Sequence, residues 1–207
     1  MADIPWTWLA IRGSGITAWA LLTAVVVWGL LLRTRLLGKW AAPVALLDMH
    51  RWLGALALTF LGVHLGLLLV DPAVHFTVAQ ILVPGLAPWQ TVAVGLGSIA
   101  FWLLIPVAVV GRLRQRMGTR GNAWFKRAHL IAYAAWPIAT MHYVLAGTDA
   151  LAQWSIAMLV AGAALVVTLL LARGFVPAPA PQRTPRTQES AVPVNSPEST
   201  ASAAVSV

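Results

Sequence analysis

The chain has 207 residues, of which 59% are hydrophobic and only 10% are charged, and its formal net charge is +8. This composition excludes an ordinary soluble domain and predicts an integral membrane protein. The absence of cysteine excludes disulfides, thiolate-held iron–sulfur clusters and covalently attached heme. The positive charge does not indicate nucleic-acid binding, because the Lys and Arg residues lie between apolar runs and form no stripe with stacking aromatic residues.

Five apolar runs, each near the roughly 20 residues that cross about 30 Å of hydrocarbon, predict an all-α polytopic bundle of about five transmembrane helices. They are expected at residues 15–37, 48–70, 90–111, 124–146 and 151–172. The N-terminal MADIPWTWLAIRGSG lacks the basic region and short apolar core of a cleavable signal peptide, so we expect none. We assign 1–173 to the membrane domain and the Pro-, Ser- and Ala-rich 174–207 to a disordered cytoplasmic tail.

Charge in the connections predicts the orientation of the chain. Lys and Arg residues are concentrated around the first and third connections, whereas DPAVHFTVAQILVPGLAPWQ and AGTDA, the second and fourth, contain none. Because cytoplasmic loops carry the excess of Lys and Arg, this pattern predicts a multi-pass protein of the cell membrane with its N-terminus outside and its C-terminus in the cytoplasm.

Four of the five histidines lie in two apolar runs: His50 and His64 in the second, His129 and His142 in the fourth. An ionisable side chain inside a membrane is costly, so it indicates function and usually has a partner on a neighbouring helix. A single such histidine is more often an interhelical hydrogen-bonding residue than a ligand, but four together favour ligands. We interpret His75, in the second connection, as a solvated loop residue.

Depth in the membrane pairs these histidines. The second and fourth runs cross in the same direction, which places His50 with His129 near the cytoplasmic face and His64 with His142 near the outer face. The axial separation is about 21 Å on the second run and about 20 Å on the fourth. On a straight helix His142 would point about 140° away from His129, and we expect a kink at Pro137 to re-aim it.

Two facing imidazoles without a nearby carboxylate or thiolate suit an axially ligated heme better than a hard cation or tetrahedral zinc. Two stacked b-type hemes are therefore predicted, with His50 and His129 on one iron and His64 and His142 on the other. Met49 and Met141 are adjacent to candidate ligands, but adjacent helix positions point about 100° apart, so we expect both to pack.

Heme propionates need cations or hydrogen-bond donors. On the inner side Arg51 and Arg127 are adjacent to, or close to, the candidate ligands, although membrane topology alone also predicts basic residues there. On the outer side Arg12 is the only Lys or Arg in this topology, and we predict that it holds the outer propionates together with Tyr143.

The two histidine-bearing segments, HRWLGALALTFLGVH and HLIAYAAWPIATMH, resemble the ferric reductase-like transmembrane domain. The segment WFKRAHLIAYAAWPIATMHY is similar to a heme helix of the membrane subunit of the periplasmic methionine sulfoxide reductase system. The resemblance covers roughly Trp8 to Ala150. It implies two b hemes that pass electrons from the cytoplasmic side to an outer acceptor, as the heme subunit of an oxidoreductase.

Two functions remain open from the sequence, besides a purely structural scaffold subunit, which would leave the matched depths of the histidines to chance. The first is a diheme cytochrome b that takes electrons from a cytoplasmic flavoprotein or quinol and delivers them to an extracytoplasmic redox protein or ferric chelate. The second is a transporter whose histidines bind a metal ion or relay protons without heme. The apolar runs contain no acidic residue well inside them to complete an ion pathway, which favours the first.

Overall fold

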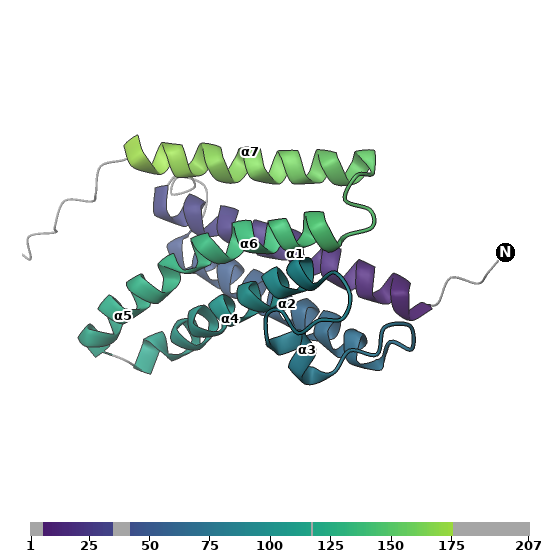
Figure 1. Ribbon diagram of the computed structural model, residues 1–207. Coiled ribbons are helices and arrows are strands. Elements are labelled where there is room, and N and C mark those ends of the chain that lie inside the picture. Colours follow the sequence, from purple (N-terminus) through teal and green to yellow (C-terminus); the bar gives the residue numbers. More distant parts are fainter. Residues whose placement is uncertain (1–5, 35–41, 117, 176–207) are drawn as a thin grey trace, which may run out of the picture. The chain divides into compact units, whose positions relative to one another are not determined.

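The computed structural model describes residues 6–34, 42–116 and 118–175, and every regular element in them is a helix. The predicted all-α bundle is therefore confirmed (Figure 1). The elements are α1 (Trp6–Thr34), α2 (Pro43–Val70), α3 (Val78–Leu82), α4 (Thr91–Leu113), the 3-10 helix η1 (Arg114–Arg116), α5 (Gly118–Leu130), α6 (Ala132–Ala146) and α7 (Gln153–Phe175). The tail predicted for 174–207 lies outside the described residues except for its first two, which still belong to α7.

Four helices, α1, α2, α4 and α7, are long and apolar enough to cross a membrane, which fits a multi-pass membrane protein. Two of them begin earlier than the apolar runs indicated. Helix α1 begins at Trp6 rather than at residue 15, and α2 begins at Pro43 rather than at residue 48. A proline is favoured in the first turn because its missing N–H would have had no partner there, and its φ already suits a helix.

The fourth predicted span, 124–146, is two helices instead of one. The break is at Ile131, whose N–H bonds the carbonyl of Ala128 three residues earlier. Pro137 lies inside α6, which continues past it, so the break at Ile131 is a second irregularity between His129 and His142 that we did not expect, and the kink at Pro137 stays a prediction. The 15 residues of α6 are fewer than the roughly 20 that cross a bilayer, so this stretch needs part of α5 to span.

Helix α3 falls in a segment that we expected to be a loop. Thr77 accepts a hydrogen bond from the Gln80 N–H, and the Gln80 side chain accepts one from the Thr77 N–H, which together form a capping box. The Thr-x-x-Gln pattern that begins this helix is visible in the sequence and was the missed signal.

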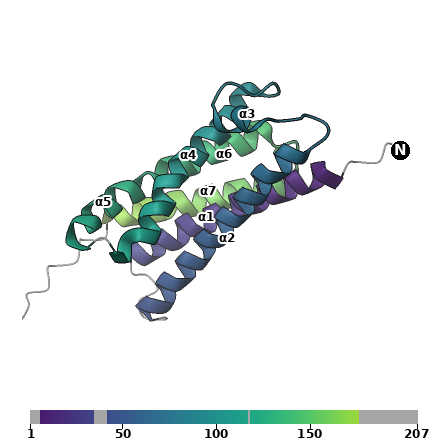
Figure 2. The same cartoon turned by 90° about the horizontal axis from the view of Figure 1, so that it is seen from below.

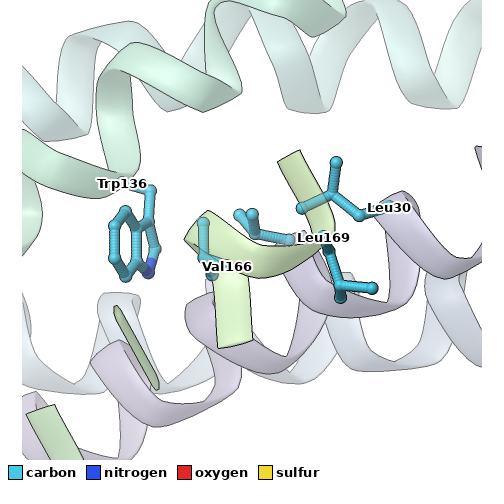
Figure 3. Packing of buried hydrophobic residues seen from close by; sticks show 5 residues of the cluster. Leu30, Trp136, Val166 and Leu169 are labelled. Carbon is cyan, nitrogen blue, oxygen red and sulfur yellow. The ribbon is translucent and has the colours of Figure 1, made fainter. Parts of the chain in front are cut away.

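The helices are arranged in two antiparallel pairs. Helix α1 packs along α2 and α4 packs along α6 (Figure 2), while α7 covers α1 on the side shown at the top of Figure 1. Leu30 of α1, Trp136 of α6, and Val166 and Leu169 of α7 form the buried core where these helices meet (Figure 3).

A reciprocal pair of hydrogen bonds joins α1 to α6. The indole N–H of Trp19 donates to the Thr140 hydroxyl, 3.0 Å away, and the indole N–H of Trp136 donates to the Thr23 hydroxyl, 2.9 Å away. Each threonine in turn donates to the carbonyl of the tryptophan on its own helix. We call these four residues the Trp–Thr clasp; it fixes the spacing between the two helix pairs.

Candidate heme site between the helix pairs

A cavity of about 840 Å³ lies between the two helix pairs. Its walls come from α1, α2, α4, α5 and α6, and they include His50, His64, His129 and His142. All four histidines singled out in the sequence therefore face one interior space. The break at Ile131 explains how α5 and α6 reach the same cavity, because a turn that is tighter than an α-helix changes the direction in which the following residues point.

The four histidines lie around the cavity in two pairs. The rings of His50 and His129 have centroids 5.8 Å apart, and those of His64 and His142 have centroids 6.5 Å apart. The angles between the ring planes, 64° and 71°, exclude face-to-face stacking. These are the same pairs that depth in the membrane predicts.

The spacing of the rings fits one metal ion between the members of each pair. A metal held about 2 Å from a nitrogen of each of two opposed imidazoles would place the ring centres roughly 6 Å apart. A metal ion held by protein ligands alone would need more of them, and no group of three or more His, Cys, Asp or Glu side chains that could hold a metal ion occurs among the described residues. Pairs of imidazoles in an apolar cavity suit a macrocyclic iron, which brings its own equatorial ligands.

Hydrogen bonds orient the rings of His64 and His142. The Nδ1 atom of His64 lies 2.9 Å from the carbonyl oxygen of Ile11 on α1, and that of His142 lies 2.7 Å from the carbonyl oxygen of Ala93 on α4. A carbonyl only accepts hydrogen bonds, so Nδ1 carries the proton in both rings and Nε2 has the free lone pair. A metal-binding histidine is commonly held through its second nitrogen in this way.

The rings of His50 and His129 are held differently. The Nδ1 atoms of His50 and His129 are buried and complete no hydrogen bond within the described part of the chain. His129 instead stacks on Phe125, with centroids 4.9 Å apart. Because a buried polar nitrogen without a partner is costly, these two rings are poorly explained as ordinary packing residues.

Not all of the residues predicted to contact propionates line the cavity. Arg51 lines the cavity and pairs with Asp48 at 3.0 Å, whereas Arg127 is exposed on α5 and is not among the described residues that line the cavity. Arg12 also lines the cavity, where it pairs with Asp149 and lies over the ring of Trp8.

Tyr143 lines the same end of the cavity, but its hydroxyl is 2.8 Å from that of Ser155 and its ring stacks on Trp19. The tyrosine therefore already has a partner within the protein. Its role towards a propionate remains a prediction.

Two cations at the end of the cavity beside His129 were missed as site residues. Arg112 and Arg114 follow the last apolar turn of α4 and line the cavity, and the Arg114 guanidinium lies 4.5 Å from the centre of the Phe125 ring that stacks on His129. The sequence showed them only as loop cations, because which face of a helix end points inward depends on the neighbouring helix.

The remaining candidates point away from the cavity. Met49 and Met141 are exposed, at 47% and 51%, which agrees with packing against lipid instead of metal ligation. His75 is exposed in the connection between α2 and α3, where it adopts a positive φ of 50°. No protein-family model, curated protein or solved structure matches this chain.

Proposed function

We propose that the protein conducts electrons across the membrane by holding two b-type hemes, one between His50 and His129 and one between His64 and His142. The observation that carries the proposal is the placement of two imidazole pairs in one apolar cavity, each pair spaced for a single metal. When bound, each heme supplies a one-electron ferric/ferrous couple.

The arrangement of the pairs favours conduction over chemistry on a substrate. Their positions on α2 are 14 residues apart, which is about 21 Å along the helix axis and covers most of the roughly 30 Å hydrocarbon thickness. His64 and His142 are positioned through Nδ1 and would ligate through Nε2, and the walls of the cavity are mostly apolar.

The charges near the cavity support an orientation for this pathway. Arg51, Arg112 and Arg114 line the end of the cavity that holds His50 and His129, which fits the cytoplasmic side by the positive-inside rule. The N-terminus would then lie outside and the C-terminus inside. Moving an electron outward from a negative interior is favourable by about 2.3 kcal/mol per 100 mV.

The partners follow from this direction. A cytoplasmic flavoprotein or quinol would supply electrons at the inner pair, and an extracytoplasmic redox protein or a ferric chelate would receive them at the outer pair. This assignment agrees with the resemblance of the two histidine-bearing segments to the ferric reductase-like transmembrane domain, and we propose membership of that family.

The test is a dithionite-reduced minus oxidised spectrum of the purified protein, with heme quantified per chain by pyridine hemochrome. We expect a b-type spectrum and two hemes per chain, falling to one in His64→Ala and in His142→Ala. His75→Asn is the matched control, because it removes an exposed histidine and asparagine tolerates its positive φ; it should retain both hemes.

A folded protein that binds no heme when expressed with an ample heme supply would contradict the proposal. Metal content and proton or ion flux would then be measured, because they test the transporter interpretation of the same histidines.

A further inference from the structure

Three glycines lie directly against the imidazole rings. A Cβ atom built on Gly97 of α4 would come within 2.8 Å of the His142 ring, one on Gly15 of α1 within 3.0 Å of the His64 ring, and one on Gly29 of α1 within 3.3 Å of the His50 ring. A Cβ at Gly97 would force the His142 ring to shift, and one at Gly15 or Gly29 would push the neighbouring ring by a few tenths of an ångström. The glycine positions are therefore part of the histidine sites.

Each carbonyl that accepts a histidine hydrogen bond belongs to the residue four positions before one of these glycines. The ring of His64 bonds the carbonyl of Ile11, four residues before Gly15. The ring of His142 bonds the carbonyl of Ala93, four residues before Gly97.

The same relation holds at the inner site. His50 lies beside the carbonyl of Val25, which is four residues before Gly29, although its Nδ1 atom does not complete a hydrogen bond there. The separation of four residues thus recurs at all three rings.

This relation has a physical cause. In an α-helix the carbonyl of residue i−4 accepts the N–H of residue i, and it keeps a second lone pair that points outward. Side chains lean towards the N-terminus of the helix, so the side chain of residue i covers that carbonyl. A glycine at i leaves the carbonyl open to a donor from a neighbouring helix.

We infer that Gly15 and Gly97 are positioning residues that open the carbonyls of Ile11 and Ala93 to the Nδ1 atoms of His64 and His142 and set the rotation of those two rings, while Gly29 leaves the matching space beside His50. The inference rests on the proposed function, because it describes how the helices beside the ligands orient them for heme. It adds that α1, which carries no ligand, determines the orientation of His64 on α2 and leaves room for the ring of His50.

The spacing of the glycines along α1 matches the spacing of the histidines along α2. Gly15 and Gly29 are 14 residues apart, as are His50 and His64, so the antiparallel α1 and α2 meet at two equivalent levels. Gly111 continues this spacing from Gly97 on α4, but no ring lies within 4 Å of its Cβ position. His129, which stacks on Phe125, is therefore not included in the inference.

The experiment compares Gly97→Ala, Gly15→Ala and Gly13→Ala. Gly13 is on the same helix as Gly15, and a Cβ there would meet nothing within 4 Å, so it controls for the change of residue type. Alanine also favours a helix over glycine, so a loss in the first two variants cannot come from helix propensity. The readouts are heme per chain and the low-spin ferric electron paramagnetic resonance signal, whose anisotropy depends on the angle between the two imidazole planes.

We expect Gly97→Ala to lower the heme content from two towards one per chain, or to shift the signal of one of the two hemes. Gly15→Ala should alter the same heme by less, since its contact is longer, and Gly13→Ala should match the unaltered protein. Wild-type heme content and signal in both Gly97→Ala and Gly15→Ala, or an equal change in Gly13→Ala, would overturn the inference. If Gly97→Ala does not fold, the comparison of Gly15→Ala with Gly13→Ala in the same two readouts decides whether the inference holds.

A second readout separates this inference from the proposed function. In heme-free protein labelled with ¹⁵N-histidine, loss of the Nδ1 hydrogen bond changes the nitrogen shifts of His142 in Gly97→Ala and of His64 in Gly15→Ala. If the unaltered protein binds no heme, the proposed function fails, and these shifts alone then support or overturn the positioning role of the glycines.

Discussion

The Trp–Thr clasp predicts how strongly the two helix pairs are held together. Thr23→Val keeps the shape of the side chain but removes the hydroxyl that accepts the Trp136 N–H. Thr23 and Trp136 are 8% and 9% exposed, so the indole N–H would be left without water or another acceptor. A buried donor without a partner costs about 1–3 kcal/mol, whereas interhelical bonds in membrane proteins average about 0.6 and reach about 1.7 kcal/mol.

We therefore expect Thr23→Val to lower the free energy of unfolding by about 1–2 kcal/mol. The measurement is a denaturation titration in mixed detergent micelles, followed by tryptophan fluorescence. Thr140→Val, on the less buried half of the clasp, should cost less.

Thr59→Val is the matched control. Its hydroxyl is exposed and bonds only the Ala55 carbonyl of its own helix, so it removes the intrahelical bond that Thr23 also makes but no interhelical one. The difference between the Thr23 and Thr59 variants isolates the clasp. A difference smaller than about 0.3 kcal/mol, within the usual scatter of additivity, would refute the reasoning.

Three further predictions concern the end of the cavity beside His64 and His142. Tyr143→Phe removes the hydroxyl bonded to Ser155 but keeps the stacked ring, so we expect a loss of about 1 kcal/mol in unfolding free energy. Thr7→Val removes the hydroxyl that donates to the buried Asp71 carboxylate, 2.9 Å away; since bonds to charged groups are worth about 1.5–3 kcal/mol, the same titration should show a larger loss. Arg12→Ala should shift the midpoint potential of one heme in a redox titration and lower its occupancy, because it removes the predicted propionate contact.

Each of these predictions has a result that contradicts it. If Thr7→Val lowered the free energy of unfolding no more than Tyr143→Phe does, the Asp71 carboxylate would have found another donor. Unchanged potential and occupancy in Arg12→Ala would mean that the guanidinium serves only its pairing with Asp149. Thr59→Val serves as the control for the threonine variant here as well, because it removes a hydroxyl without an interhelical partner.

Some of the structure could be predicted from the sequence because it depends on properties of a single helix. The length of an apolar run decides whether it can cross a membrane, and the rise per residue decides how deep each side chain lies. Depth alone matched His50 with His129 and His64 with His142, and the structure places the members of each pair side by side. The capping box of α3 was equally local, although we missed it.

Rotation about the helix axis and the identity of neighbouring groups could not be obtained in this way. The break at Ile131, not Pro137, divides the fourth span, because a small change in turn geometry redirects a whole helix and depends on what packs against it. The inward direction of Arg112 has the same origin. The close approach of Gly97 to the His142 ring likewise depends on how α6 packs against α4.

The sequence by itself thus determined the membrane class, the helical state and the level of each histidine, since these follow from composition and from a fixed rise of 1.5 Å per residue. Only the tertiary structure decided which carbonyl, glycine or cation each histidine meets. Those contacts lie between residues far apart in the chain, such as Ala93 and His142, and they exist only when neighbouring helices pack.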